Sequence, residues 1–161
     1  MLRIHQKADS WGANLFKKES SPFRDEFDLY YFFLMTGIGL GLKDRQKDSI
    51  KQMKDITKGY TKSFPNSSKY KIAGIVLIEK LFSSGFDLNN RKIVKNFIES
   101  TLDYEDGNTF LTRESIDLMN NYAFNGFLYI KESLTSPPDA ANFFVWFNDE
   151  IKPKLFKNFG S

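Results

Sequence analysis

Six lysines recur along one stretch of the sequence at intervals that match an α-helix. Their separations are four, four, three, four and four residues, which would place all six ammonium groups on one helical face. Such a row of charge can neutralise phosphates and release their condensed counterions. The members of this lysine row are Lys43, Lys47, Lys51, Lys54, Lys58 and Lys62. We therefore expect the lysine row to bind nucleic acid.

The positive charge of the chain is concentrated around this row. Residues 43–71 hold nine Lys or Arg and three Asp or Glu, a local charge of +6, whereas the whole 161-residue chain carries +3. No base-reading motif accompanies the charge, so contact with double-stranded DNA would be directed to the backbone. Two alternatives stay open, because surface lysines also dock acidic proteins or keep a helix soluble, and Asp44, Asp48 and Asp55 offset part of the charge.

A second pattern, further along the sequence, could do metal chemistry. Pro138-Asp139, ten residues and then Glu150-Ile151-Lys152 formally match the PD-(D/E)xK nuclease pattern, in which two carboxylates hold a divalent metal and a lysine assists the attacking water. That chemistry needs the carboxylates on adjacent strands, but the residues between them include no glycine turn. A metal-dependent nuclease is therefore the lesser alternative, and we expect a non-enzymatic protein without catalytic residues, metal or cofactor.

Composition removes several other classes of chemistry. The chain has no cysteine and one histidine, His5, so disulfides, thiolate zinc sites and cysteine nucleophiles are excluded. A Ser-His-Asp triad could use only His5, which we expect to lie in a mobile terminus. The first residues, MLRIHQKADSWG, contain no apolar export segment, which predicts a cytoplasmic protein.

The elements that position these residues must pack around the most apolar stretch of the chain, YYFFLMTGIGLGL at residues 30–42. It is too short for a membrane-spanning helix, which needs about 20 residues. Ser21 as N-cap and Pro22 at the first helical position predict a helix from about Pro22 to Leu40, buried on most faces. Its alternating glycines come at the helix end and no Gly-Lys-Ser/Thr follows, so they indicate close packing or a helix C-terminus rather than a phosphate loop.

Four further segments have helical patterns. These are residues 69–85, closed by Gly85; residues 89–103, capped by Asn89 or Asn90; residues 112–134, capped by Thr112; and residues 139–153. With the central helix and the lysine row, they predict an all-α fold. We expect a single compact domain over residues 1–161, with about six helices around a buried central helix.

Four aromatic residues within five positions of the last predicted helix indicate a docking surface. Phe143, Phe144, Trp146 and Phe147 cannot all face one core from a single helix, so at least one should meet a partner. The hypothesis that rivals nucleic-acid binding is therefore a protein–protein adaptor or an oligomeric scaffold subunit, in which the lysines only solubilise the surface. A homo-oligomer is one form of this hypothesis.

Three short segments carry a resemblance to a known family. They are Ile4-His5-Gln6-Lys7-Ala8-Asp9, Pro22-Phe23 with the apolar helix that ends in Gly41-Leu42-Lys43, and Ile75-Val76-Leu77-Ile78-Glu79-Lys80-Leu81 before Gly85-Phe86-Asp87-Leu88. These segments resemble the small helical proteins of bacterial DNA phosphorothioation (Dnd) systems, such as the DndE family and Dnd-associated accessory proteins. The resemblance implies a non-enzymatic, DNA-associated accessory subunit of a bacterial phage-defence or DNA-modification system. It also implies that other subunits of the system are its partners and that apolar helix faces allow it to oligomerise.

Overall fold

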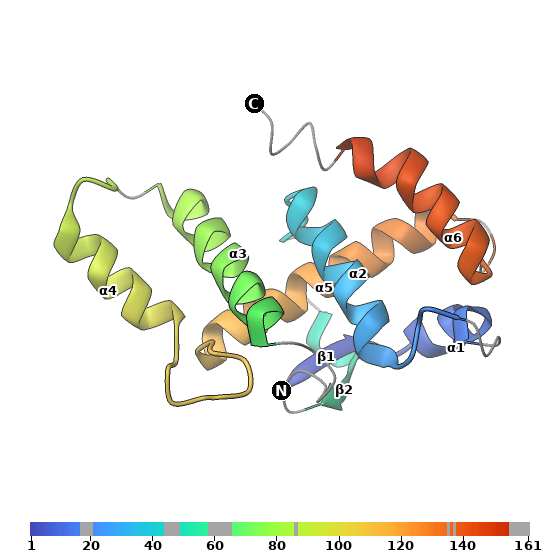
Figure 1. Cartoon of the computed structure of the whole chain (residues 1–161), viewed down its shortest axis with the longest axis horizontal. Helices are drawn as coiled ribbons and strands as arrows, with labels where there is room; N and C mark the ends of the chain where they lie inside the picture. Colours follow the sequence, from blue (N-terminus) through green and yellow to red (C-terminus); the bar gives the residue numbers. More distant parts are fainter. Residues whose placement is uncertain are drawn as a thin grey trace. The chain divides into compact units, whose positions relative to one another are not determined.

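The computed structural model describes residues 1–16, 21–43, 49–57, 66–85, 87–134, 136 and 138–154. Within them the chain forms six α-helices and a sheet of two short strands, β1 and β2 (Figure 1). The bounds are β1 Leu2–His5, α1 Ala8–Gly12, α2 Glu26–Gly39, β2 Met53–Thr57, α3 Asn66–Ser84, α4 Arg91–Thr101, α5 Arg113–Ser133 and α6 Ala140–Trp146. The predicted all-α class with about six helices is confirmed.

Contacts along the chain divide it into two compact units. Unit 1 comprises Met1–Leu2 and Thr57–Met119, and unit 2 comprises Arg3–Ile56 and Asn120–Ser161. The division falls inside α5, whose first residues belong to unit 1 and whose later residues belong to unit 2. The single domain over residues 1–161 therefore stays a prediction. No helix among the described residues is both long and apolar enough to cross a bilayer.

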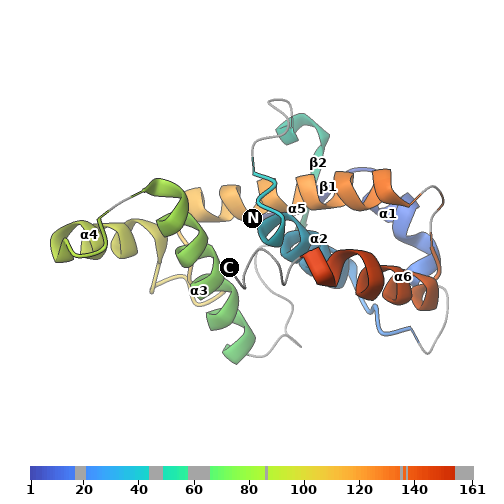
Figure 2. The same cartoon turned by 90° about the horizontal axis from the view of Figure 1, so that it is seen from above.

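Helix α2 is the buried central helix that the apolar stretch predicts. Most of its side chains are inaccessible, because apolar residues cover nearly its whole circumference. The buried residues are Phe27, Leu29, Tyr30, Phe33, Leu34, Thr36, Gly37, Ile38 and Gly39. In unit 2, this helix crosses α5 and lies beside α6, whose Phe143 ring is 5.6 Å from that of Phe32 (Figure 1 and Figure 2).

The start of α2 differs from the prediction of a helix from Pro22. The helix begins at Glu26, and its N-cap is Asp25 rather than Ser21. The Asp25 carboxylate accepts from the backbone N–H groups of Phe27 and Asp28, while the Asp28 carboxylate accepts from the Asp25 N–H at 3.3 Å. This reciprocal capping box satisfies N–H groups at both positions, which a lone serine hydroxyl could not do.

The end of α2 confirms the helix C-terminus predicted from the glycines. Gly41 adopts a positive φ of 63°. The Leu42 N–H donates to Gly37 O at 2.8 Å, and the Gly41 N–H donates to Ile38 O at 3.0 Å. These two bonds form a Schellman motif, which satisfies the last carbonyls of the helix and needs a residue that tolerates the left-handed conformation.

Gly37 also confirms the other predicted role, which is close packing. A Cβ at Gly37 would lie 2.0 Å from the carbonyl oxygen of Tyr122 in α5, and a Cβ at Gly126 would lie 1.9 Å from Phe33 O in α2. Both distances are far below van der Waals contact, so only glycine fits at either position. The two helices therefore cross with their backbones in direct contact.

In its described part, the lysine row does not form the predicted helix. Ser49–Gln52 is a 3₁₀ turn, and Met53–Thr57 is strand β2. The Gln6 N–H donates to Gln52 O at 2.8 Å, and Arg3 Nε lies 2.9 Å from Asp55 Oδ1, so partners run in opposite order along β1 and β2. Pairing with β1 satisfies the backbone of this segment and outweighs its local helical pattern.

In unit 1, α3 and α4 have the terminal signals that the sequence predicts. Helix α3 ends at Ser84, and Gly85 follows with a positive φ of 65°. Asn90 caps α4 by accepting from the Ile93 N–H at 3.2 Å. Lys80 of α3 connects the elements of this unit, because its ammonium lies 3.2 Å from Glu114 Oε1 and 5.7 Å from the centre of the Phe97 ring.

Candidate nucleic-acid interface

Three residues of the lysine row lie among the described residues, and they do not share a helical face. Lys43 follows the end of α2, Lys51 lies in the 3₁₀ turn before β2, and Lys54 lies within β2. Lys47, Lys58 and Lys62 fall outside the described residues. The prediction that these lysines share one helical face is therefore wrong for the described residues. The local concentration of positive charge is a property of the sequence and does not depend on the helix.

Lys54 is engaged by a carboxylate at the start of α2. Its Nζ lies 2.6 Å from Glu26 Oε1, and about a third of each side chain is exposed, at 31% for Lys54 and 40% for Glu26. A charge-assisted hydrogen bond of this length is stronger than a bond between neutral groups. The positive charge of Lys54 is thus offset locally, and its attraction for a distant phosphate is reduced.

The backbone carbonyls of Lys51 and Lys43 accept hydrogen bonds from side chains of the same unit. The Gln6 side-chain amide donates to Lys51 O at 3.1 Å, and the Asn125 side-chain amide donates to Lys43 O at 3.3 Å. Lys51 is exposed, whereas Lys43 is half-buried. Among the described residues of the row, Lys51 is therefore the best placed to meet a solvent-borne polyanion.

The nuclease pattern lies on helical backbone. Asp139 is the N-cap of α6 and accepts from the Asn142 N–H at 2.9 Å, whereas Glu150 lies in the π-helical turn Phe147–Ile151 and is 3.8 Å from Lys154 Nζ. The adjacent strands that would bring the two carboxylates onto one metal are thus replaced by a helix. Within the described part of the chain, no group of three or more His, Asp or Glu side chains could hold a metal.

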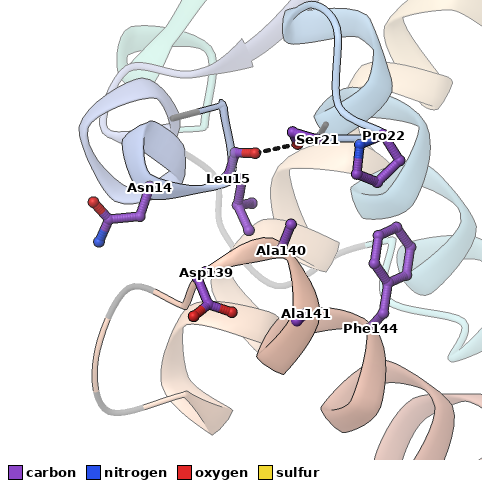
Figure 3. A pocket seen from close by; sticks show the side chains of 8 residues that line it. All are labelled: Asn14, Leu15, Ser21, Pro22, Asp139, Ala140, Ala141 and Phe144. Atoms are coloured by element: carbon purple, nitrogen blue, oxygen red, sulfur yellow. Dashed lines mark hydrogen bonds between the residues drawn. The ribbon is translucent and has the colours of Figure 1, made fainter. Parts of the chain in front are cut away.

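A hollow of about 260 Å³ lies at the start of α6 in unit 2 (Figure 3). It is lined by Asn14, Leu15, Ser21, Pro22, Asp139, Ala140, Ala141 and Phe144. The Ser21 hydroxyl donates to Leu15 O, and the Asp139 carboxylate accepts from both N–H groups of Asn142, from the backbone and from the side chain. Ser21 and Asp139 are thus engaged in local hydrogen bonds, and the Asn14 side chain points away from the other lining residues (Figure 3), unlike the convergent polar groups of a typical ligand site.

The predicted aromatic docking surface is divided between core and surface. Phe143 is fully buried, so it is a core residue and is not available to a partner. Phe144 is 36% exposed, while Trp146 and Phe147 are half-buried. Val145 is aliphatic and so lay outside the aromatic pattern of the sequence, but it is 61% exposed. The exposed apolar surface of α6 therefore centres on Phe144 and Val145.

His5 lies in the core of unit 2, and the prediction that it belongs to a mobile terminus is wrong. Its ring lies 5.1 Å from that of Phe124 and 4.8 Å from that of Phe127, and its Nδ1 accepts from the Lys7 N–H at 2.9 Å. Burial lowers the pKa of His5 below its ordinary value of 6.5, with a smaller contribution in the same direction from Lys131. These contacts make His5 a packing residue.

No family model, no curated protein and no solved structure matches this chain. The resemblance to Dnd-associated proteins therefore depends on the segments quoted from the sequence.

Proposed function

We propose that this protein binds the backbone of nucleic acid, most simply double-stranded DNA, through the basic segment 43–62. The support is the local charge of +6 over residues 43–71, together with the exposed position of Lys51 on a turn that Gln6 holds against β1. Phosphate contact needs positive charge in reach of the duplex but no fixed helical register, so the strand at β2 is compatible with it.

The resemblance to Dnd-associated proteins extends this proposal to a biological setting. In it, the chain is a non-enzymatic accessory subunit of a bacterial phage-defence or DNA-modification system. DNA binding directed to the backbone suits such a role, because it positions a subunit on DNA while other subunits supply sequence choice and chemistry.

A salt titration of DNA binding tests the proposal. If four lysines contact phosphates, the logarithm of affinity should fall with the logarithm of salt at a slope of about −3.6. Replacing Lys51 or Lys54 by alanine should reduce the slope, by about 0.9 for each of them that contacts a phosphate. Fluorescence anisotropy with a labelled duplex measures both effects.

Lys95 supplies the matched control for that titration. It lies on α4 in unit 1, is 74% exposed and pairs with Glu99 across one helical turn, so Lys95→Ala removes one surface lysine outside the basic segment. Its slope should equal that of the parent. The proposal fails if the parent does not bind at about 50 mM salt, where backbone contacts are weakly screened, or if a Lys51→Glu, Lys54→Glu double variant binds as tightly as the parent.

The adaptor function is the second candidate, and the observation that favours it is the exposure of Phe144 and Val145 on α6. In this function the pair docks another subunit, and the lysines only solubilise the surface. Light scattering tests its homo-oligomeric form, in which Val145→Glu should convert an oligomer into a monomer. An unchanged mass for that variant would reject this form.

The non-enzymatic part of the proposal has its own test. The purified protein incubated with plasmid and Mg²⁺ or Mn²⁺ should leave the DNA intact, because Asp139 and Glu150 lie on a helical segment. Cleavage that disappears in an Asp139→Asn variant would establish the nuclease instead. Asparagine can still cap α6, so loss of the helix would not explain that result.

A further inference from the structure

Helix α3 has an apolar stripe on its solvent side. Tyr70, Gly74, Ile78 and Phe82 follow one another at intervals of four residues, so they form a continuous ridge along the helix. The three large side chains are 60%, 53% and 73% exposed, respectively, and no atom lies within 4 Å of a Cβ placed at Gly74. We call these four residues the α3 stripe.

The stripe is separate from the buried side of α3. That side consists of Ile72, Ala73 and Val76, each at most 5% exposed. Tyr70 stacks on Phe110 at 4.8 Å, but most of its surface remains accessible. Large apolar side chains gathered in one exposed line are typical of an interaction surface.

The α3 stripe can pack against a second copy of itself, because a small residue, Gly74, and a large one, Ile78, lie next to each other at its middle. We propose that α3 is a self-association surface, which pairs in antiparallel orientation with α3 of a second copy of this chain. A two-fold axis midway between Gly74 and Ile78 places Ile78 of each copy against Gly74 of the other and places Tyr70 against Phe82. The glycine leaves room for the isoleucine, as ridges that repeat every four residues require when two helices pack together.

Charge supports a second copy as the occupant and favours the antiparallel arrangement. Lys71 and Glu79 lie on the same flank of the stripe, one beside its N-terminal half and the other beside its C-terminal half. An antiparallel pair brings this flank of both copies to the same side of the interface, so that each Lys71 lies beside the Glu79 of the other copy. A parallel pair would place the two flanks on opposite sides, where these charges do not meet. Opposite charges at the rim disfavour the wrong register more than they add affinity.

The length of the stripe sets the expected strength of association. From residue 70 to residue 82 it extends about 18 Å, at 1.5 Å per residue. One helix pair of this length buries less than the roughly 1,200 Å² of a standard stable interface. We therefore expect a weak, reversible dimer.

Sedimentation over a range of protein concentrations tests the dimer. The mass should rise from 18.7 kDa toward twice that value in the parent and should stay at 18.7 kDa in an Ile78→Glu variant. Leu88→Glu is the matched control, since it introduces the same charge at another exposed apolar residue, in the turn before α4 in unit 1. A parent that stays monomeric, or association that Leu88→Glu abolishes and Ile78→Glu preserves, would overturn the proposal.

Cross-linking tests the antiparallel register, because the chain contains no cysteine of its own. Gly74→Cys and Ile78→Cys variants, mixed and oxidised, should give more covalent dimer than either variant alone, since disulfides need Cα atoms about 4.4–6.8 Å apart. Each variant carries one cysteine, so no internal disulfide can form. Equal cross-linking of Gly74→Cys with itself would contradict the register.

The dimer and the proposed DNA binding use different residues, so their failures can be told apart. Ile78→Glu should leave the salt slope per chain unchanged, and Lys51→Ala should leave the sedimentation behaviour unchanged. A parent that dimerises but does not bind DNA rejects the DNA-binding proposal alone, and a parent that binds DNA but stays monomeric rejects the dimer alone.

Discussion

Gly37 of α2 and Gly126 of α5 lie at the same helix crossing, where a Cβ added to Gly126 would come within 2.9 Å of the Gly37 nitrogen. Each glycine also faces a carbonyl oxygen of the opposite helix, at Tyr122 and at Phe33. The crossing is therefore backbone against backbone, and side chains on either side of it close the core of unit 2.

Substituting either glycine by alanine should destabilise the protein strongly. The new methyl group would collide with backbone rather than with a movable side chain, so the free energy of unfolding should fall by at least about 2 kcal/mol, toward the upper part of the range for overpacking. Urea denaturation followed by circular dichroism measures the change. Gly74→Ala is the control, measured at concentrations below dimer formation, because its Cβ meets nothing and alanine favours a helix by about 1 kcal/mol.

Tyr30 and Asn120 form a buried hydrogen bond between α2 and α5. The Tyr30 hydroxyl donates to Asn120 Oδ1 at 3.0 Å, and that oxygen also accepts from the Arg3 N–H at 2.9 Å. Tyr30→Phe should lower the free energy of unfolding by about 1 kcal/mol, because the asparagine oxygen keeps its bond to Arg3. Tyr104→Phe, at a side chain that is 70% exposed, should change it little. Equal effects of the two substitutions would show that the buried bond is not stabilising.

His5 should make stability depend on pH. Because burial lowers its pKa in the folded state, the unfolded chain binds the proton first. Its contribution to stability is complete above the unfolded pKa of 6.5 and is lost as the pH falls through the window below that value. The slope attributable to this one proton is at most about 1.4 kcal/mol per pH unit.

A His5→Asn variant isolates that contribution from the titration of carboxylates. Asparagine can still accept the Lys7 N–H, but it does not titrate. Urea denaturation at pH 7.5 and at lower pH should show a smaller loss of stability in the variant than in the parent. Parallel pH curves would mean that His5 titrates alike in the folded and unfolded chain.

Asp25→Ala should reveal where α2 begins. Losing the capping box should cost about 1 kcal/mol of the free energy of unfolding. Asp117→Ala removes an exposed carboxylate from within α5 and serves as the comparison. If both substitutions had the same small effect, the helix start would not depend on Asp25.

The buried helix α2 illustrates how much local pattern can predict. Its apolar residues cannot remain in water on any face, so its burial and the helical class of the chain followed from residue type alone. Gly41 and Gly85 likewise mark helix ends because few other residues tolerate a positive φ. The N-cap of α2 was predicted wrongly, because Ser21 before Pro22 and Asp25 before Glu26 are both plausible N-cap signals in the sequence.

The basic segment illustrates the opposite case. Its lysine spacing is helical, yet Met53–Thr57 is a strand because β1, more than forty residues earlier in the chain, offers it hydrogen-bond partners. Residues distant in sequence also decide the environments of Lys54 and Phe143. The charge of Lys54 is offset by Glu26, and Phe143 is buried beside the aromatic rings of Phe23 and Phe32. Residue type and spacing determined the helical class, the buried helix and the concentration of positive charge, because these depend on near neighbours. The pairing of strands, the partner of each charge and the burial of each ring depend on residues distant in sequence, and the folded chain alone decided them.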